Sequence, residues 1–392
     1  MSAEEVNQAS SSGEVDKLRE LFAKGASVNA KDKFQHTALH MAVQNDQLAT
    51  TEFLLGAKAD VNAVTSTGCT PLHDSAMKYS PATSPAIIKL LVAASANINA
   101  QNGEGLGVLH FAAMFSKTDA DAVDATDTYL AAGVSTQLRT ISGQISARTK
   151  ALEKHHTGMA YYLDLSDGKH ADDSATLFVH CASHGMLRPV RKALAKGLDV
   201  NSFDQSGYTA LHASIRKGQS ESVRFLLEAK ADPNLSTHSL QPAEQQARHH
   251  VRAPLHLAAC DGAFGDIFAL LLDAKADLEA EDGQGLNVMH CLAKYAPYFS
   301  EADSCTVANM LFKYGAYVLL SRRTKEDDTP HDLAVKRKHN HVAAHFKHTL
   351  AETRSAFETE LGSHLPVADL VTLVLDYMWP ISRAAWEEYQ YY

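Results

Sequence analysis

Two short segments recur along this 392-residue chain at nearly constant spacing. The start segment has the pattern Thr-x-Leu-His, as at 37–40, 70–73 and 209–212, and the finish segment has the pattern Leu-Leu-x-x-x-Ala-Asp-x-Asn, as at 54–62 and 226–234. Successive start histidines are 33, 37, 70, 32, 44 and 34 residues apart, so the unit is about 33 residues and the longest gap holds about two units. Such a period indicates a stack of small helical units, each packed on its neighbours.

Each unit contains the signals of two helices and a turn. In the start segment the Thr is placed to cap a first helix, and Pro often follows at the first helical turn. The Leu-Leu pair belongs to a second helix and faces the stack, and Ala-Asp-x-Asn then leaves the helix. We therefore expect helix–turn–helix units that are joined by β-turn fingers.

The two segments resemble those of ankyrin repeats, and the resemblance covers about residues 4–350. It implies an all-α fold, an ankyrin-repeat solenoid of helix-turn-helix units with β-turn fingers, followed by a C-terminal helical tail. It also implies that the start histidine forms hydrogen bonds within and between repeats. Seven structural repeat histidines occupy this place: His40, His73, His110, His180, His212, His256 and His290.

The repeat pattern divides the chain into four segments. We expect an N-terminal ankyrin block of about four units at 4–140, a segment at 141–174, a C-terminal block of about five units at 175–353, and a capping or F-box-like tail at 354–392. Segment 141–174 is interpreted either as a degenerate repeat or hinge, or as a lid or docking element over the concave face. In the last unit Asp332 replaces the histidine, which suits a capping repeat without a next neighbour.

The turn after each second helix needs a left-handed backbone, which favours glycine. The expected glycine is present at 25, 133, 197 and 315. At the same place in other units stand Lys58, Ser95, Lys230 and Lys275. Each of these four substitutions is expected to cost up to about 1 kcal/mol of stability.

Composition excludes several classes of function. The chain has 36 Lys and Arg against 46 Asp and Glu, a net charge of −10, so we expect no nucleic acid partner. No apolar run reaches about 18 residues, and the N-terminus lacks the basic and apolar regions of a secretory signal. Five scattered cysteines without a CxxC pair suit reduced thiols. We expect a monomer without a membrane span, located in the cytoplasm, or in a host cytosol if it is an exported effector.

No residue pattern indicates catalysis. The chain lacks the known hydrolase, kinase, metalloprotease and nucleotide-binding motifs. Cys181 and Cys291 follow repeat histidines, but those histidines are expected to be engaged in backbone hydrogen bonds. His341 and His345 lie four apart, as metal ligands on a helix can, yet no Asp, Glu or Cys completes a set nearby. We therefore expect no catalytic residue, no cofactor and no metal.

The concave face of such an array is the expected binding surface for a protein partner. Positions shortly after each repeat histidine should line it: Met41, Gln44, Asn45, Met77, Lys78, Phe111, Met114, Phe115, Arg216, Lys217, Asp261, Lys294 and Tyr295. Aromatic and Met side chains there are candidate anchors, although they could instead pack on a neighbouring finger. Finger-tip candidates are Phe34, Leu106, Tyr208 and Leu286.

The tail contains an apolar helix pattern between Pro366 and Pro380. This stretch resembles the short core of F-box-like tails, which in that family bind the Skp1 adaptor of a ubiquitin ligase. The residues that would dock are Leu365, Pro366, Leu370, Val374, Tyr377 and Trp379. The alternative is a hydrophobic cap that seals the last repeat.

Three functions follow from these patterns. The first is a non-enzymatic interaction scaffold or adaptor that binds a protein on its concave surface. The second is a substrate-recruiting subunit of a ubiquitin ligase, in the manner of a viral or bacterial effector that acts in a host cell. The third is an enzyme that uses segment 141–174 and its histidines. We favour the first.

Overall fold

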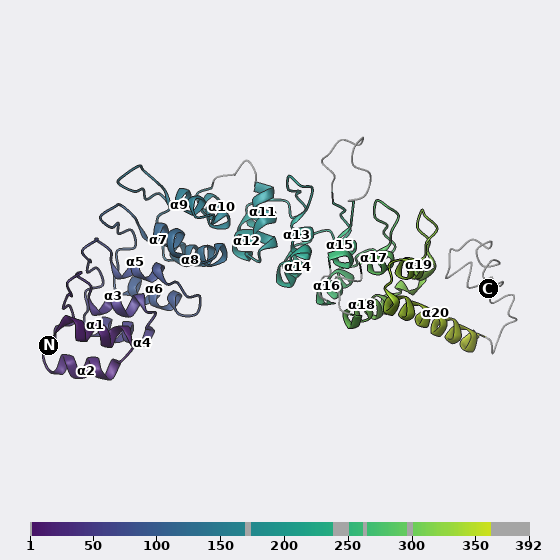
Figure 1. Cartoon of the computed structure of the whole chain (residues 1–392). Coiled ribbons are helices and arrows are strands. Elements are labelled where there is room, and N and C mark those ends of the chain that lie inside the picture. Colours follow the sequence, from purple (N-terminus) through teal and green to yellow (C-terminus); the bar gives the residue numbers. More distant parts are fainter. Residues whose placement is uncertain (1, 169–173, 238–250, 262–264, 296–300, 362–392) are drawn as a thin grey trace. The chain divides into compact units, whose positions relative to one another are not determined.

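The regular elements of the computed structural model are helices throughout the residues that it describes, 2–168, 174–237, 251–261, 265–295 and 301–361 (Figure 1). The chain divides into two compact units, Met1–Asp199 and Val200–Tyr392. Unit 1 contains α1 to α12, and unit 2 contains α13 to α20 with one 3-10 helix. The all-α fold class is confirmed. The six predicted tail-docking residues, Leu365 to Trp379, lie outside the described residues.

Unit 1 is a series of short helices. Their bounds are α1 (Ala3–Ser11), α2 (Val15–Ala23), α3 (Ala38–Gln44), α4 (Leu48–Gly56), α5 (Pro71–Met77), α6 (Ser84–Ala93), α7 (Val108–Phe115), α8 (Asp119–Ala131), α9 (Ala147–Glu153), α10 (Thr157–Ser166), α11 (Ser174–Ser183) and α12 (Leu187–Ala195). Helices α1, α3, α5, α7 and α9 pack side by side in sequence, and α2, α4, α6, α8, α10 and α12 form a second row beside them. We call these rows the inner and the outer helices.

Unit 2 repeats this arrangement. Its helices are α13 (Ala210–Arg216), α14 (Ser220–Glu228), α15 (Pro254–Asp261), α16 (Gly265–Asp273), α17 (Val288–Tyr295), α18 (Glu301–Lys313), the 3-10 helix η2 (Ala316–Ser321), α19 (Pro330–Lys336) and α20 (Asn340–Leu361). The inner row is α13, α15, α17 and α19, and the outer row is α14, α16, α18 and α20. Within each unit, successive helices of the inner row therefore contact each other, as a stacked array requires.

Within the start segments of α3 and α5 the Thr and the His are hydrogen-bonded to each other, and the His also reaches the next repeat. Thr37 is the N-cap of α3, and its backbone N–H donates to Nδ1 of His40 at 3.2 Å. The other ring nitrogen of His40, Nε2, donates to the carbonyl of Cys69 in the next repeat at 3.1 Å. Thr70 and Pro71 begin α5 in the same way, and the ring of His73 joins Thr70 to the carbonyl of Leu106.

The predicted role of the histidine is confirmed in most repeats. His110, His256 and His290 donate across the repeat boundary to the carbonyls of Ile145, Leu286 and Asp328, at 3.0, 3.0 and 3.2 Å respectively. His180 differs, because its Nε2 is bonded to the Thr157 hydroxyl at 2.9 Å and lies 3.7 Å from the carboxylate of Asp119. Its side chain is 37% exposed, and among the described residues its Nε2 contacts side chains of earlier repeats.

The finish segment also joins neighbouring repeats. The side-chain oxygen of Asn29 accepts the backbone N–H of Asp60 at 2.8 Å, and Asn62 does the same for Asn97 at 2.7 Å. In unit 2 the pairs are Asn201 with Asp232 and Asn234 with Asp277. In each of these four pairs the asparagine therefore satisfies a backbone donor of the following unit.

The backbone after the outer helices is left-handed, as predicted. The φ angle is between 90° and 96° at the four expected glycines and between 63° and 70° at Lys58, Ser95, Lys230 and Lys275. The fingers are linked in turn by backbone bonds such as Ile141 N–H to the Glu104 carbonyl, at 2.9 Å. Gly105 is required beside that bond, because a Cβ there would lie 2.5 Å from the Ile141 nitrogen.

Part of segment 141–174 is a helix pair. Helices α9 and α10 pack on each other, α9 packs on α7, and α10 packs on α8. Ser146 caps α9 by accepting the N–H of Thr149 at 3.1 Å. At the other end of the chain, Asp332 replaces the histidine by accepting the N–H and the hydroxyl of Thr329, at 3.0 and 2.7 Å.

Candidate protein-binding surface

The last turn of each inner helix carries side chains that the core does not use. In the same helices the residues just after the start histidine are largely buried, whereas those four and five positions after it are half-buried or exposed, except for the buried Cys260. We call these last-turn residues the inner-helix face: Gln44, Asn45, Met77, Lys78, Met114, Phe115, Arg216, Lys217, Asp261, Lys294 and Tyr295. Two separate stretches of this face exist, one in each unit.

In unit 1 the face is formed by contacts between equivalent positions. Nε2 of Gln44 lies 3.7 Å from the sulfur of Met77, and the Lys78 ammonium donates to Oδ1 of Asn45 at 3.4 Å. Phe115 follows at the end of α7 with 43% of its surface exposed. The sequence placed these residues on one surface, and the structure brings equivalent residues of α3 and α5 into contact.

The residues directly after the start histidine, among which Met41 and Phe111 were predicted to line the surface, are less accessible than expected. Met41 is half-buried, Asp74 is 3% exposed and Phe111 is 4% exposed. Phe111 packs edge-on against His73, with ring centroids 5.0 Å apart, and lies 5.6 Å from the ring of Phe115. Phe111 was predicted to be a contact residue, but its ring is part of the core and supports the exposed ring of Phe115.

Asp74 is a polar residue in an otherwise apolar row. Burial raises the pKa of its carboxyl to about 8. Oδ2 of this carboxyl has no hydrogen-bond partner among the described residues. The only sequence signal is its place: Asp74 directly follows a start histidine, where α15 has Leu257.

The predicted finger tips fall into two groups. Phe34 is 55% exposed beneath the Lys33 ammonium, and Tyr208 is half-buried beneath the Arg216 guanidinium. Leu106 and Leu286 were predicted to be exposed tips, but they are only 6% and 5% exposed. Their backbone carbonyls accept the hydrogen bonds from the rings of His73 and His256, so both residues lie between adjacent repeats.

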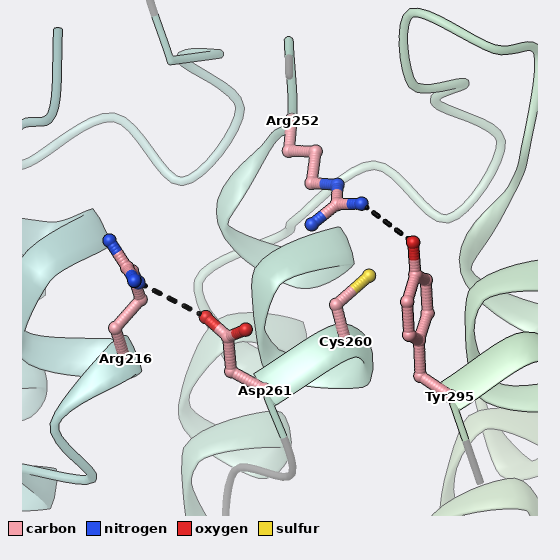
Figure 2. A pocket seen from close by; sticks show the side chains of 5 residues that line it. All are labelled: Arg216, Arg252, Cys260, Asp261 and Tyr295. Carbon is pink, nitrogen blue, oxygen red and sulfur yellow. Dashed lines mark hydrogen bonds and ion pairs between the residues drawn. The ribbon is translucent and has the colours of Figure 1, made fainter. Parts of the chain in front are cut away.

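Unit 2 contains a pocket of about 320 Å³ on the inner-helix face. Figure 2 shows its lining: Arg216 at the end of α13, Cys260 and Asp261 at the end of α15, Tyr295 at the end of α17, and Arg252 just before α15. Three of these five residues, Arg216, Asp261 and Tyr295, were predicted from their spacing. Arg252, which lies outside the recurring segments, was not.

Arg252 is held by an aromatic ring and a buried carboxylate. Its guanidinium lies 5.4 Å from the ring centre of Tyr295 and donates to the phenol oxygen at 2.9 Å. Nε of Arg252 lies 4.0 Å from Oδ2 of Asp282, whose side chain is 1% exposed. Asp282 is itself fixed, because its Oδ1 accepts the backbone N–H groups of Gln284 and Leu286.

The cysteines next to repeat histidines are poor candidates for nucleophiles. Burial raises the pKa of the Cys181 thiol. A hydrogen bond with Cys260, together with burial, raises the pKa of Cys291 well above its usual range. Both shifts disfavour the thiolate, which is the reactive form.

The two histidines four apart on α20 were considered above as metal ligands. Nε2 of His345 lies 3.0 Å from Oδ1 of Asn309, an amide oxygen. Within the described part of the chain, no three side chains among His, Cys, Asp and Glu are gathered closely enough to hold a metal ion.

Comparison with known proteins identifies the repeats. A family profile described as "Ankyrin repeats (3 copies)" matches residues 6–102 and 148–237. The human transient receptor potential cation channel subfamily A member 1 is 32% identical over 129 residues, which are 31% of this chain. Human Rabankyrin-5 is 27% identical over 297 residues, or 66% of this chain, and the Arabidopsis thaliana E3 ubiquitin-protein ligase KEG is 32% identical over 113 residues, or 29%.

These relatives are much longer than the matched region. The match spans 10% of the channel, 25% of Rabankyrin-5 and 6% of the plant ligase. No helix in the described ranges combines the length and the apolar character that a bilayer crossing needs.

Proposed function

We propose that this chain, two stretches of which match the ankyrin-repeat profile, is a non-enzymatic interaction protein that binds a partner protein on its inner-helix face. The observation that supports this most is the pocket of unit 2. There the last turns of three successive inner helices contribute Arg216, Asp261 and Tyr295 to one surface. Arginine and tyrosine are enriched at protein interfaces, where they supply much of the binding energy.

The physical argument is that stacking leaves these side chains unused. The rows of inner and outer helices bury the residues that hold the repeats together, and the His and Asn bonds satisfy the backbone between repeats. The last-turn side chains add little to that core. A repeat array offers such residues as an extended, preformed surface, so a partner need not order it on binding.

A paired set of charge reversals tests the proposal. The tagged full chain would be used to capture partners from cell lysate for mass spectrometry. One variant carries Lys78→Glu and Lys217→Glu on the inner-helix face; the matched control carries Lys89→Glu and Arg224→Glu, on exposed positions of the outer helices α6 and α14. The proposal predicts that the first variant loses partners that the control keeps. The reverse pattern, or equal loss at unchanged melting temperature, would contradict it.

The alternative function is that of a substrate-recruiting subunit of a ubiquitin ligase. It is supported by the F-box-like sequence of the tail around Leu370 and Val374. The plant relative carries the name E3 ubiquitin-protein ligase. Binding of purified Skp1 to the full chain, and its loss when the chain ends at residue 353 or carries Leu370→Asp and Val374→Asp, would support this function. A variant that also loses thermal stability would indicate a capping helix instead.

A further inference from the structure

The pocket of unit 2 contains two guanidinium groups on opposite sides, at the ends of Arg216 and Arg252 (Figure 2). Each is packed on an aromatic ring: Arg216 lies 5.0 Å from the ring centre of Tyr208, and Arg252 lies 5.4 Å from that of Tyr295. Stacking on a ring fixes the plane of a guanidinium and leaves its edge for hydrogen bonds. The pocket therefore has two oriented groups of N–H donors.

The carboxylates of Asp261 and Asp282 do not occupy all of these N–H donors. Nε of Arg252 is 4.0 Å from Asp282, which is too far for a hydrogen bond, and this buried nitrogen has no acceptor among the described residues. Nε of Arg216 is 3.3 Å from Asp261, but both side chains of this pair are partly exposed, at 49% and 31%. An exposed ion pair of this kind contributes at most about 1 kcal/mol and exchanges easily.

We propose that this pocket binds the carboxylate of a glutamate or aspartate side chain of the partner protein, between Arg216 and Arg252. This inference deepens the proposed function and depends on it. A carboxylate has two oxygens that match the forked N–H groups of arginine, and such charge-assisted bonds are the strongest hydrogen bonds at protein surfaces. At about 320 Å³ the pocket is at the lower end of the range for small-molecule sites, so it has room for one side chain.

The charge balance favours a carboxylate over a phosphoryl group. Among the described residues, the charged groups that line the pocket or contact its lining are the cations Arg216, Arg252 and Lys294, whose ammonium lies 5.6 Å from the ring centre of Tyr295, and the anions Asp261 and Asp282. Three positive and two negative groups leave one net positive charge, which one carboxylate neutralises. A phosphoryl group carries close to two negative charges, and the second would meet both aspartates at short range.

Substitution of Asp261 distinguishes a carboxylate-binding pocket from an ion pair that is only structural. If Asp261 only stabilised the helix ends through Arg216, removing either partner would have the same effect on binding. If a partner carboxylate competes with Asp261 for Arg216, the two substitutions have opposite effects. Arg216→Gln removes a donor and weakens binding, whereas Asp261→Asn removes the competitor and strengthens it.

The experiment begins with random peptides displayed on phage, selected on the full chain without assuming a partner. Peptides enriched in Asp or Glu at one position are expected. The best peptide is then synthesised as a fluorescent probe, together with versions that carry Gln or phosphoserine in place of the acidic residue. Fluorescence anisotropy gives the dissociation constants for the wild-type chain, Arg216→Gln, Asp261→Asn and the control Arg224→Gln, an exposed arginine of α14.

We expect the Glu-to-Gln peptide and the Arg216→Gln chain each to bind about tenfold more weakly, since each loses a charge-assisted hydrogen bond. We expect tighter binding to Asp261→Asn, no change with Arg224→Gln, and weaker binding of the phosphoserine peptide. Arg252→Lys, which keeps the charge but loses the fork, should also weaken binding and shows that the planar group matters.

Other results overturn the inference. Selected peptides without an acidic preference, equal effects of Arg216→Gln and Asp261→Asn, or tighter binding of phosphoserine would each do so. In those cases the proposed function still stands if the lysate capture shows loss only with the inner-face variant. If neither capture nor peptide selection yields a binder, both the inference and the proposed function fail.

Discussion

At the scale of single residues, Asp74 is the residue that we expect to destabilise the fold most clearly. Its carboxyl is buried in α5, Oδ2 has no hydrogen-bond partner among the described residues, and its pKa is raised to about 8. A carboxyl with a raised pKa binds a proton in the folded state that the unfolded state has already lost above about pH 4. Its contribution to stability is therefore full below pH 4 and is lost as the pH rises to 8.

We predict that Asp74→Leu raises the free energy of unfolding at pH 8, by about 1–3 kcal/mol, because an unsatisfied buried polar group is removed. The gain should shrink at pH 5, where the wild-type carboxyl is already protonated. Urea unfolding of both proteins at the two pH values measures this. A gain that is equal at both values would show that the carboxyl does not titrate in this range.

The left-handed turns give a second prediction at this scale. Ser95 and Lys230 have φ of 70° and occupy the place that glycine takes in other repeats. Ser95→Gly and Lys230→Gly should each raise the unfolding free energy by about 0.5–1 kcal/mol, because glycine adopts this backbone without strain. As a matched reversal, Gly25→Ala, at φ 90°, should lower it by a similar amount. Thermal melting of the three variants decides the sign.

At the scale of elements, the sequence predicted each helix whose start segment was intact, because Thr, Pro and His specify the cap directly. The pair α9 and α10 was harder to recognise. Ser146 and Thr149 stand where the other units have Thr and His, and they form a cap without a ring that could reach the next repeat. This unit has no start histidine, so the spacing of the histidines did not reveal where it begins.

The buried start histidines should make stability depend on pH. Burial lowers the pKa of His40, His212 and His290 to about 4. Between about pH 6.5 and 4 the unfolded chain binds protons that the folded chain does not, so stability is lost as the pH falls through this window. From pH 6.5 to 5 each ring should contribute about 2 kcal/mol to that loss.

Urea titrations of the Asp74→Leu variant at pH 7, 6 and 5 measure this loss without the opposite effect of the Asp74 carboxyl. In that background, His40→Gln should reduce the dependence on pH while lowering stability at pH 7. A flat profile between pH 7 and 5 would mean that these rings are not held neutral by the fold.

At the scale of the whole molecule, the period of about 33 residues was enough to predict the fold and the row of last-turn residues, because stacking repeats the same environment in each unit. It could not predict what differs between units. Arg252 lies outside both recurring segments, and its place over Tyr295 depends on packing between α15 and α17. The burial of Leu106 and Leu286 likewise follows from bonds made between fingers and histidines of adjacent repeats.

The central claim is that a protein partner binds to the inner-helix face, and hydrogen–deuterium exchange on the captured complex tests it most directly. We predict slower exchange, relative to the chain alone, in the last turns of α13, α15 and α17 and in the fingers before them, with little change in α14 and α16. Slower exchange confined to these outer helices, with the inner helices unchanged, would contradict the claim.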